Sequence, residues 1–310
     1  MAHRGRITTF ASFSLGNTRS VAINTILGFS WDQQRGRAEN LATRYPFAQD
    51  ALGFFRQLIS FQETMFEGLP VQPEHVPVEK DGPFPLRELF GEQHHDLLLS
   101  KFPEFLDLVQ KIAPSALAEA AGALRSVPAE RWEALLDAYW FQDTGQPDSP
   151  DEAGAIDFFP KAFLQPYAAG LANRVRGDGN EAGIDWKVAE GIGVCPMCGA
   201  KAQVSVLRPE SHGASRTLLC SLCATEWRFK RVRCVSCGEE EFDRLLYHST
   251  DQFPHVRLNL CETCHTYIKE VDLTKETQAV PVVDEIATIP LDIVAVERGY
   301  HKLELNLIGM

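Results

Sequence analysis

The fold of the C-terminal part of this chain is decided by four short motifs: Cys195-Pro-Met-Cys198, Cys220-Ser-Leu-Cys223, Cys234-Val-Ser-Cys237 and Cys261-Glu-Thr-Cys264. Every cysteine of the chain belongs to one of these C-x2-C pairs. Two intervening residues form a tight turn that directs both sulfur atoms at one ion. Disulfides are rare in a reducing compartment, and a thiol-exchange enzyme needs one pair beside a β-α-β unit. Metal ligation is therefore the favoured interpretation.

The four motifs form an internal repeat with a period of about 40 residues. In each half a glycine (Gly199, Gly238) follows the first pair, and an arginine (Arg216, Arg257) lies four residues before the second pair. The repeat predicts one four-cysteine site per half. The first site is Cys195, Cys198, Cys220 and Cys223, and the second is Cys234, Cys237, Cys261 and Cys264. A crossed arrangement that joins the two middle pairs is the alternative, which the repeat disfavours.

Four thiolates per site complete the tetrahedral coordination of zinc or of a single iron. Because no position stays open for a substrate, metal-centred hydrolysis is disfavoured. The spacing does not choose between the two metals, and zinc is the usual ion of a structural four-cysteine site. His212, His248 and His265 could replace a thiolate, but four cysteines per half make this unnecessary.

The runs between the cysteine pairs predict β-hairpins. Residues 202–207 and 216–219 flank a turn in the first half, and residues 245–248 and 256–260 do so in the second. Each metal site would clip a sheet that is too small to fold alone. We therefore assign residues 188–275 to two tandem metal modules.

Upstream of the cysteines, apolar residues recur at the three- and four-residue steps of amphipathic helices. The clearest stripes lie in residues 47–66, 97–109, 117–124 and 132–140. We predict a bundle of about five or six helices over residues 36–180. Residues 1–35 form an atypical lead-in. A disordered segment or an over-extended start of translation is favoured over a targeting signal, because no compact apolar core is present.

Two further segments complete the predicted organisation. Residues 276–310 form a helical tail, interrupted at Pro290 and ended by Gly299, that we expect to pack on the metal modules. Charged and apolar residues mostly alternate along residues 226–233, which predicts a strand with one basic face between the modules. A solvated strand edge is the simpler interpretation of this strand. The functional alternative is a partner-binding strip that contains Thr225, Glu226, Trp227, Arg231 and Arg233.

Charge and hydropathy restrict the possible partners. The 310-residue chain has a net charge of −12, which opposes binding to nucleic acid and to anionic membranes. No apolar run approaches the ~18 residues of a membrane helix, so we expect no membrane insertion and place the protein in the cytoplasm. No phosphate-binding fingerprint is present, and no small-molecule substrate is expected.

Taken together, these motifs resemble the FdhE family of formate dehydrogenase accessory proteins. The resemblance is strongest from Cys195 onward and extends more weakly back to about Arg37. The residues that carry it are Cys195-Pro-Met-Cys198-Gly199, Leu219 to Trp227, Arg231-x-Arg233-Cys234, Arg257, Tyr267-x-Lys269, Leu291-Asp292, Gly299-Tyr300 and Asn306-Leu307.

The resemblance implies an α plus small β fold, with an N-terminal helical bundle followed by two tandem rubredoxin-like or zinc-ribbon modules. It implies a cytoplasmic, non-enzymatic maturation factor that binds the catalytic subunit of respiratory formate dehydrogenase. It also implies one iron ion in each of the two sites, with zinc as the alternative. A rubredoxin-like electron carrier and a zinc-ribbon nucleic-acid-binding protein are the competing classes. The large helical domain is unnecessary for the first, and the acidic charge opposes the second.

Overall fold

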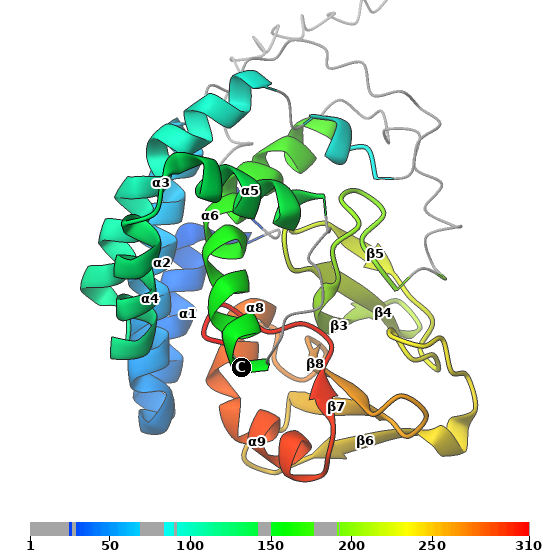
Figure 1. Cartoon of the computed structure of the whole chain (residues 1–310). Helices are drawn as coiled ribbons and strands as arrows, with labels where there is room; N and C mark the ends of the chain where they lie inside the picture. The colour runs from blue at the N-terminus through cyan, green and yellow to red at the C-terminus, as the bar shows by residue number, and fades with distance from the viewer. Residues whose placement is uncertain are drawn as a thin grey trace, which may run out of the picture.

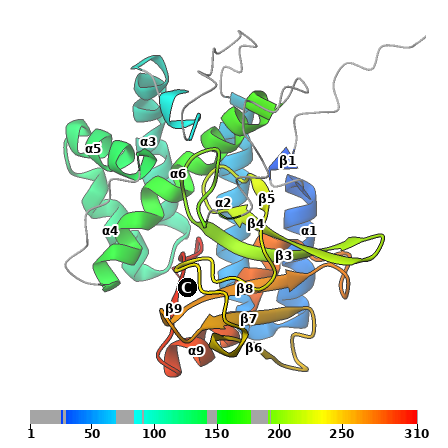
Figure 2. The same ribbon diagram turned by 90° about the vertical axis from the view of Figure 1, so that its right-hand side faces the viewer.

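Helices form one layer of this protein and a twisted sheet forms the other (Figure 1, Figure 2). The computed structural model describes residues 25–26, 29–68, 84–89, 92–141, 150–176, 191 and 193–309. Most of the predicted lead-in lies outside this range, as do residues 177–190, where the predicted helical domain ends and the metal modules begin. None of the described helices is long and apolar enough to cross a membrane.

The helical layer confirms the predicted N-terminal bundle. Its helices in the described residues are α1 (Trp31–Arg44), α2 (Gln49–Gly68), α3 (Glu92–Ile112), α4 (Ser115–Arg125), α5 (Ala129–Trp140) and α6 (Pro150–Arg176). Two-residue strands β1 (Thr25–Ile26) and β2 (Phe29–Ser30) precede α1, and 3-10 turns cover Pro46–Ala48 and Arg87–Leu89. Aromatic side chains fill the centre: the Phe163 ring centroid lies 4.9 Å from that of Phe102 and 5.5 Å from that of Phe105.

Helix α1 begins at Trp31, earlier than the predicted start of the helical domain. A capping box fixes this start, since the N–H of Ser30 donates to Gln33 (2.7 Å) and the N–H of Gln33 donates to Ser30 (3.1 Å). The Trp31 side chain is buried and packs edge-on against Phe66. Residues 31–35 therefore belong to the helical layer and not to the lead-in.

Both predicted hairpins are present, and they join into one sheet. Its strands are β3 (Ala202–Glu210), β4 (Gly213–Cys220), β5 (Glu226–Arg228), β6 (Leu245–Ser249), β7 (Val256–Cys261), β8 (Thr266–Asp272) and β9 (His301–Lys302). The order is β5-β4-β3-β8-β7-β6, with β9 beside one end of β8. Strands β3 and β8 run parallel, with Ser205 opposite Glu270, and this pairing fuses the two tandem modules.

The C-terminal tail packs back on the sheet, as predicted. Helices α8 (Pro281–Ala287) and α9 (Ile289–Glu297) meet at the predicted interruption, and Gly299 follows α9 with a φ of 83°. A positive φ of this kind suits glycine because it has no Cβ. Helix α8 contacts α1 and α2 on one side and β3 and β8 on the other.

One buried carboxylate on α8 connects the two layers. Asp284 accepts hydrogen bonds from Nε and Nη2 of Arg37 in α1 (2.9 and 2.6 Å), and its Oδ1 lies 2.7 Å from Nε2 of His255. Burial acts to raise the pKa of Asp284, but the hydrogen bonds with His255 and Arg37 outweigh it and lower that pKa. The contact fixes the orientation of the helical layer over the sheet.

Candidate metal centres

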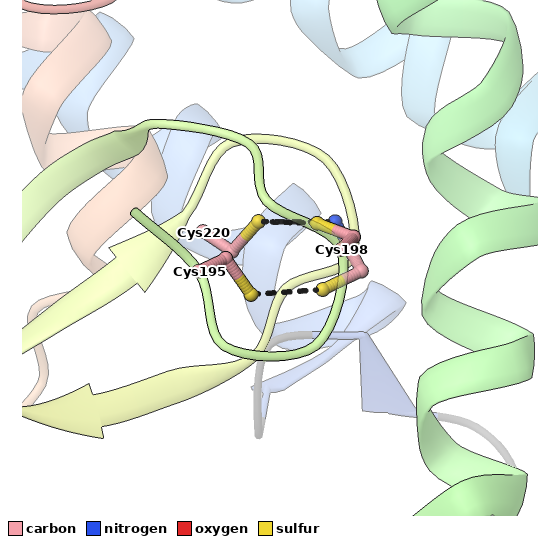
Figure 3. A group of neighbouring side chains, drawn as sticks. Cys195, Cys198 and Cys220 are labelled. Atoms are coloured by element: carbon pink, nitrogen blue, oxygen red, sulfur yellow. Dashed lines mark hydrogen bonds between the residues drawn. The ribbon is translucent and has the colours of Figure 1, made fainter. Parts of the chain in front are cut away.

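The first cysteine cluster lies where two turns face each other. Cys195 and Cys198 belong to the turn before β3, while Cys220 ends β4 and Cys223 follows it. Figure 3 shows Cys195, Cys198 and Cys220 gathered in this space. The Sγ atoms of Cys195 and Cys223 are 3.5 Å apart, and those of Cys198 and Cys220 are 3.4 Å apart. All four side chains are buried.

The second cluster repeats this arrangement nearer to solvent. Cys234 and Cys237 lie before β6, Cys261 ends β7, and Cys264 precedes β8. The Sγ atoms are 3.7 Å apart in both the Cys234–Cys264 and the Cys237–Cys261 pair. In contrast to the first cluster, Cys237 is exposed and Cys264 is partly exposed. Each half thus forms its own cluster, and the crossed pairing does not occur.

The sulfur positions fit a tetrahedral ion in both clusters. An ion held by four sulfurs at about 2.3 Å spaces those sulfurs about 3.8 Å apart. The observed spacings of 3.4 to 3.7 Å are close to this value, and the four sulfurs of each cluster lie within 4.8 Å of one another. They are far longer than a disulfide bond of about 2.05 Å. Each cluster is therefore able to bind one metal ion through four thiolates.

The turns have the backbone geometry that their sequences require. Gly199 and Gly238 both have a φ of 79°, and each donates its N–H to the carbonyl oxygen of the first cysteine of its pair (2.8 and 3.2 Å). After the second pairs, Ala224 and His265 occupy the same left-handed region without being glycine. These turns also place N–H groups near sulfur, since Leu222 N lies 3.3 Å from the Cys220 Sγ. Such donors offset thiolate charge.

One thiol of each cluster has a lowered pKa. Burial acts to raise the pKa of Cys223, but its neighbouring thiols and the hydroxyl of Thr225, 3.2 Å away, lower it well below its ordinary value. Burial also acts to raise the pKa of Cys264, but hydrogen bonds with Thr266, followed by the neighbouring thiols, lower it to about 6. A threonine two residues after the last cysteine is thus a shared feature of the two halves.

The repeated arginines meet at one shared carboxylate between the clusters. Arg216 Nε lies 3.3 Å from Glu270 Oε2, and Arg257 Nε donates to Glu270 Oε1 at 2.8 Å. Arg216 also donates to the carbonyl oxygens of Lys230 and Arg233 (3.1 and 3.0 Å), which fixes the segment between the two halves. Glu270 and Arg216 are both buried, and burial lowers the pKa of Arg216. The two arginines therefore hold the modules in register with each other.

The helical layer contacts the first cluster directly. The N–H of Leu86 donates to the carbonyl oxygen of Met197 (3.0 Å), and Arg87 Nε donates to that of Cys198 (3.1 Å). Leu86 is fully buried, and the Arg87 guanidinium stacks over the Phe84 ring at 4.7 Å. The segment 84–89 thus covers the first cluster, whereas Cys237 and Cys264 leave the second cluster open to solvent.

Sequence reasoning missed a buried group of charges beneath the sheet. Lys269 of β8 pairs with Asp292 of α9 and donates to the Glu285 carbonyl oxygen (2.7 Å). Lys302 pairs with the Glu285 carboxylate and lies 3.1 Å from Asp292 Oδ1. Burial lowers the pKa of Lys269; it acts to raise that of Glu285, but the ammonium groups of Lys302 and Lys269 outweigh it and leave that pKa lowered. These pairs fasten both C-terminal helices to β8.

A signal for this network was present in the sequence. Tyr267, Lys269, Asp292 and Asn306 are among the residues that carry the family resemblance, although they lie far apart along the chain. Tyr267 donates to Asp292 (3.0 Å), and Asn306 Nδ2 donates to Glu285 (2.8 Å). A lysine at an inward position of an apolar strand requires a buried carboxylate partner, which only the fold identifies.

The predicted partner strip separates into buried and exposed parts. Strand β5 covers only Glu226–Arg228, because the chain then turns toward the second cluster. Thr225 and Trp227 are buried, and Glu226 is paired with Arg208. Arg231 is exposed and Arg233 partly exposed. Both arginines of the predicted strip can therefore reach a partner, as can the neighbouring exposed Arg228, Lys230 and Val232.

Both cysteine-containing halves are similar to known protein domains. The family model of the FdhE central domain matches residues 194–231, and that of the FdhE C-terminal domain matches residues 232–308. Each matched segment contains one complete cysteine cluster. The boundary between the two segments lies next to the exposed Arg231.

Several proteins are similar along most or part of the chain. A protein named FdhE homolog from Aquifex aeolicus is 26% identical over 275 residues, covering 87% of this chain and 92% of the relative. A Pseudomonas putida protein of the same name is 36% identical over 129 residues, which are 39% and 40% of the two chains. The crystal structure of the FdhE protein from Pseudomonas aeruginosa has the same fold, with a TM-score of 0.62, 24% identity, and coverage of 90% and 94%.

Proposed function

We propose that this chain, which belongs to the FdhE family of formate dehydrogenase accessory proteins, assists enzyme maturation by binding the catalytic subunit of formate dehydrogenase. The observation that carries the proposal is the pair of closed four-cysteine clusters within one sheet, of which only the second faces solvent. Four thiolates leave no coordination position for a substrate. The clusters thus support a rigid binding surface and not a metal-dependent active site.

The eight cysteines would hold one metal ion in each cluster. The bound ion supplies a cross-link between the turn before a hairpin and the turn after it. The family resemblance favours iron, and zinc is the alternative, since both accept tetrahedral thiolate coordination. In either case the cross-link lowers the entropy cost of presenting fixed side chains to a partner.

The proposed contact surface includes Arg231 and Arg233 beside the second cluster. Arg231 donates to the carbonyl oxygen of Ala214 (3.4 Å) and pairs with no carboxylate among the described residues. Arg233 shares the Glu240 carboxylate with Lys230. A local positive surface on a chain of net charge −12 supports specific docking of an acidic partner surface.

The proposal places this event in the cytoplasm and assigns the chain no catalytic step, no nucleic-acid ligand and no small-molecule substrate. The primary test uses the full-length, metal-loaded chain in a host that produces formate dehydrogenase but lacks its own accessory protein. We expect the catalytic subunit to co-purify with the chain and formate dehydrogenase activity to be restored. If the metal-loaded wild type gives neither co-purification nor restored activity, the proposal is wrong.

A pair of charge reversals tests the position of the contact surface. Arg231→Glu with Arg233→Glu should reduce recovery of the catalytic subunit at least tenfold, because charge reversal at a contact costs several kcal/mol. The matched control is Lys101→Glu with Arg125→Glu on the exposed helical surface, which should leave recovery unchanged. Metal content of both variants should equal that of the wild type. Equal recovery by the two double variants would exclude this surface.

A rubredoxin-like electron carrier is the second candidate, and the exposure of the second cluster is the observation that favours it. Electron exchange requires a metal close to the surface, and Cys237 is exposed. Optical spectra of the chain purified without added metal would reveal iron-thiolate absorption. If a reductant reversibly removes this absorption, at a rate fast enough for catalytic electron transfer, the electron-carrier function would be favoured. Zinc in both clusters would exclude it.

A further inference from the structure

A pocket of 240 Å³ lies beside the second cluster, on the face of the sheet that carries Arg257 and Glu270. Its walls come from β6, β7 and β8 and from the segment 231–236 between the two halves. Tyr247, Asn259 and Ile268 form a row across the three strands in the observed register. We refer to this space as the second-cluster pocket.

Exposed apolar side chains gather around the second-cluster pocket. Val232, Phe242, Leu246 and Tyr247 line it, with exposed fractions of 47%, 71%, 45% and 65%. They are four of the nine large hydrophobic residues that are exposed in the described part of the chain. A soluble protein rarely concentrates such residues at one place unless they meet a partner. Three of these residues come from β6 and the turn before it, at the edge of the sheet.

The charged side chains of the second-cluster pocket are all arginines. Arg216, Arg231, Arg233 and Arg257 line it, and no aspartate or glutamate does so. Arg216 and Arg257 share Glu270, and Arg233 shares Glu240 with Lys230. Part of this positive charge offsets the thiolates of Cys234 and Cys261, which also line the pocket. Arg231, at the rim, has no carboxylate partner among the described residues and remains available.

We propose that the second-cluster pocket binds a bulky apolar side chain from an acidic peptide segment of a protein partner. The apolar side chain would enter between Tyr247 and the segment 231–236, and a carboxylate of the same segment would pair with Arg231. Apolar residues around a pocket favour an anchor side chain, and the arginine rim selects acidic flanks. The inference rests on the proposed function only for the identity of the partner. The chemistry of the docked segment is inferred from the pocket itself.

Synthetic peptides test this binding directly. The probes are fluorescent peptides of roughly ten residues that carry acidic flanks around a central phenylalanine. Two comparison peptides replace the phenylalanine by alanine or the acidic residues by lysine. Titration with the metal-loaded full chain, followed by fluorescence anisotropy, should give the tightest binding for the acidic phenylalanine peptide. Each replacement should weaken binding at least tenfold, and added salt should weaken it further.

Two valine substitutions provide the matched comparison. Val232→Asp places an acidic group at the pocket rim, whereas Val296→Asp makes the same change at an exposed position of α9, where the side chain is 61% exposed. Neither valine is buried, so both variants should fold and retain both metals. Val232→Asp should weaken binding of the acidic phenylalanine peptide at least tenfold, and Val296→Asp should change it less than twofold. Equal affinities for the three peptides, or equal effects of the two substitutions, would overturn the inference.

Comparison with the co-purification assay separates this inference from the proposed function. If the catalytic subunit co-purifies equally with wild type and the Val232→Asp variant, and the acidic phenylalanine peptide shows no selective binding, the pocket inference fails while the proposed function stands. If the acidic phenylalanine peptide binds selectively but the catalytic subunit does not co-purify, the pocket is correct and its partner is another protein.

Discussion

The two glycines that follow the first cysteine pairs allow a controlled measurement of how the helical layer holds the first cluster. Gly199 and Gly238 have the same φ of 79° and the same position in their turns. A Cβ added at Gly199 would lie 2.4 Å from Arg87 Nη2, whereas one added at Gly238 would lie 3.4 Å from Arg233 Nη2. Alanine at the two positions therefore differs mainly in its contact with Arg87.

The magnitude follows from these contacts. An L-residue in the left-handed region costs about 1–2 kcal/mol, and this cost applies equally to Gly199→Ala and Gly238→Ala. At residue 199 the Arg87 side chain must also move, which breaks its hydrogen bond to the Cys198 carbonyl oxygen. Losing that bond adds about 1 kcal/mol. We expect about 2–3 kcal/mol of destabilisation for Gly199→Ala and about 1–2 kcal/mol for Gly238→Ala.

The assay is urea unfolding of metal-loaded protein, followed by far-ultraviolet circular dichroism, with the metal content of each variant measured in parallel. Arg87→Ala supplies the control, because Gly199→Ala should cost about 1 kcal/mol less in the Arg87→Ala background than in the wild type. Equal costs for the two glycine substitutions would refute the reasoning. So would an unchanged cost of Gly199→Ala after Arg87 has been truncated.

Four further predictions concern the clusters and the buried ion pairs. Cys198→Ser should empty the first cluster and leave the second metal bound, and a chelator should strip the more exposed second cluster first in the wild type, as elemental analysis of each sample would show. Glu270→Gln should lower the free energy of unfolding by about 3 kcal/mol, since it removes the carboxylate that Arg216 and Arg257 share; an effect below about 1 kcal/mol in urea unfolding would contradict this role. Folding lowers the pKa of Asp284 from its ordinary value of 3.8. The ionised Asp284 therefore stabilises the folded protein above pH 3.8, and this stabilisation is lost as the pH falls below that value. In the Asp284→Asn variant the free energy of unfolding should therefore fall less steeply as the pH drops below 3.8. An equally steep fall in the variant and the wild type, measured by unfolding over this pH range, would count against the prediction.

The metal clusters were largely predictable because their chemistry is local. A C-x2-C turn brings two sulfurs together within four residues, and the repeat indicates which pairs share an ion. The positive φ of Gly199 and Gly238 was likewise predictable from the turn. The helical stripes and the interruption at Pro290 follow from periodicity and from the missing N–H of proline. In these cases the deciding interactions connect residues that are near in sequence.

Pairing over long distances was not predictable in the same way. Strands β8 and β9 were not predicted, and neither was the parallel pairing of β3 with β8, because strand neighbours depend on packing that no local pattern specifies. The exposure of the predicted strip was also decided by tertiary contacts. Trp227 is buried in the core, whereas Arg231 emerges where the chain turns away from β5.

By itself, the sequence determined the fold class, the eight cysteines and their grouping, because short-range geometry and an internal repeat specify them. Only the tertiary structure decided that the two modules share one sheet, that Lys269 and Asp292 form a buried pair, and that one cluster is enclosed while the other faces solvent. These features depend on segments separated by many residues. Their positions are fixed when burial of apolar surface and of paired charges selects one arrangement of the layers.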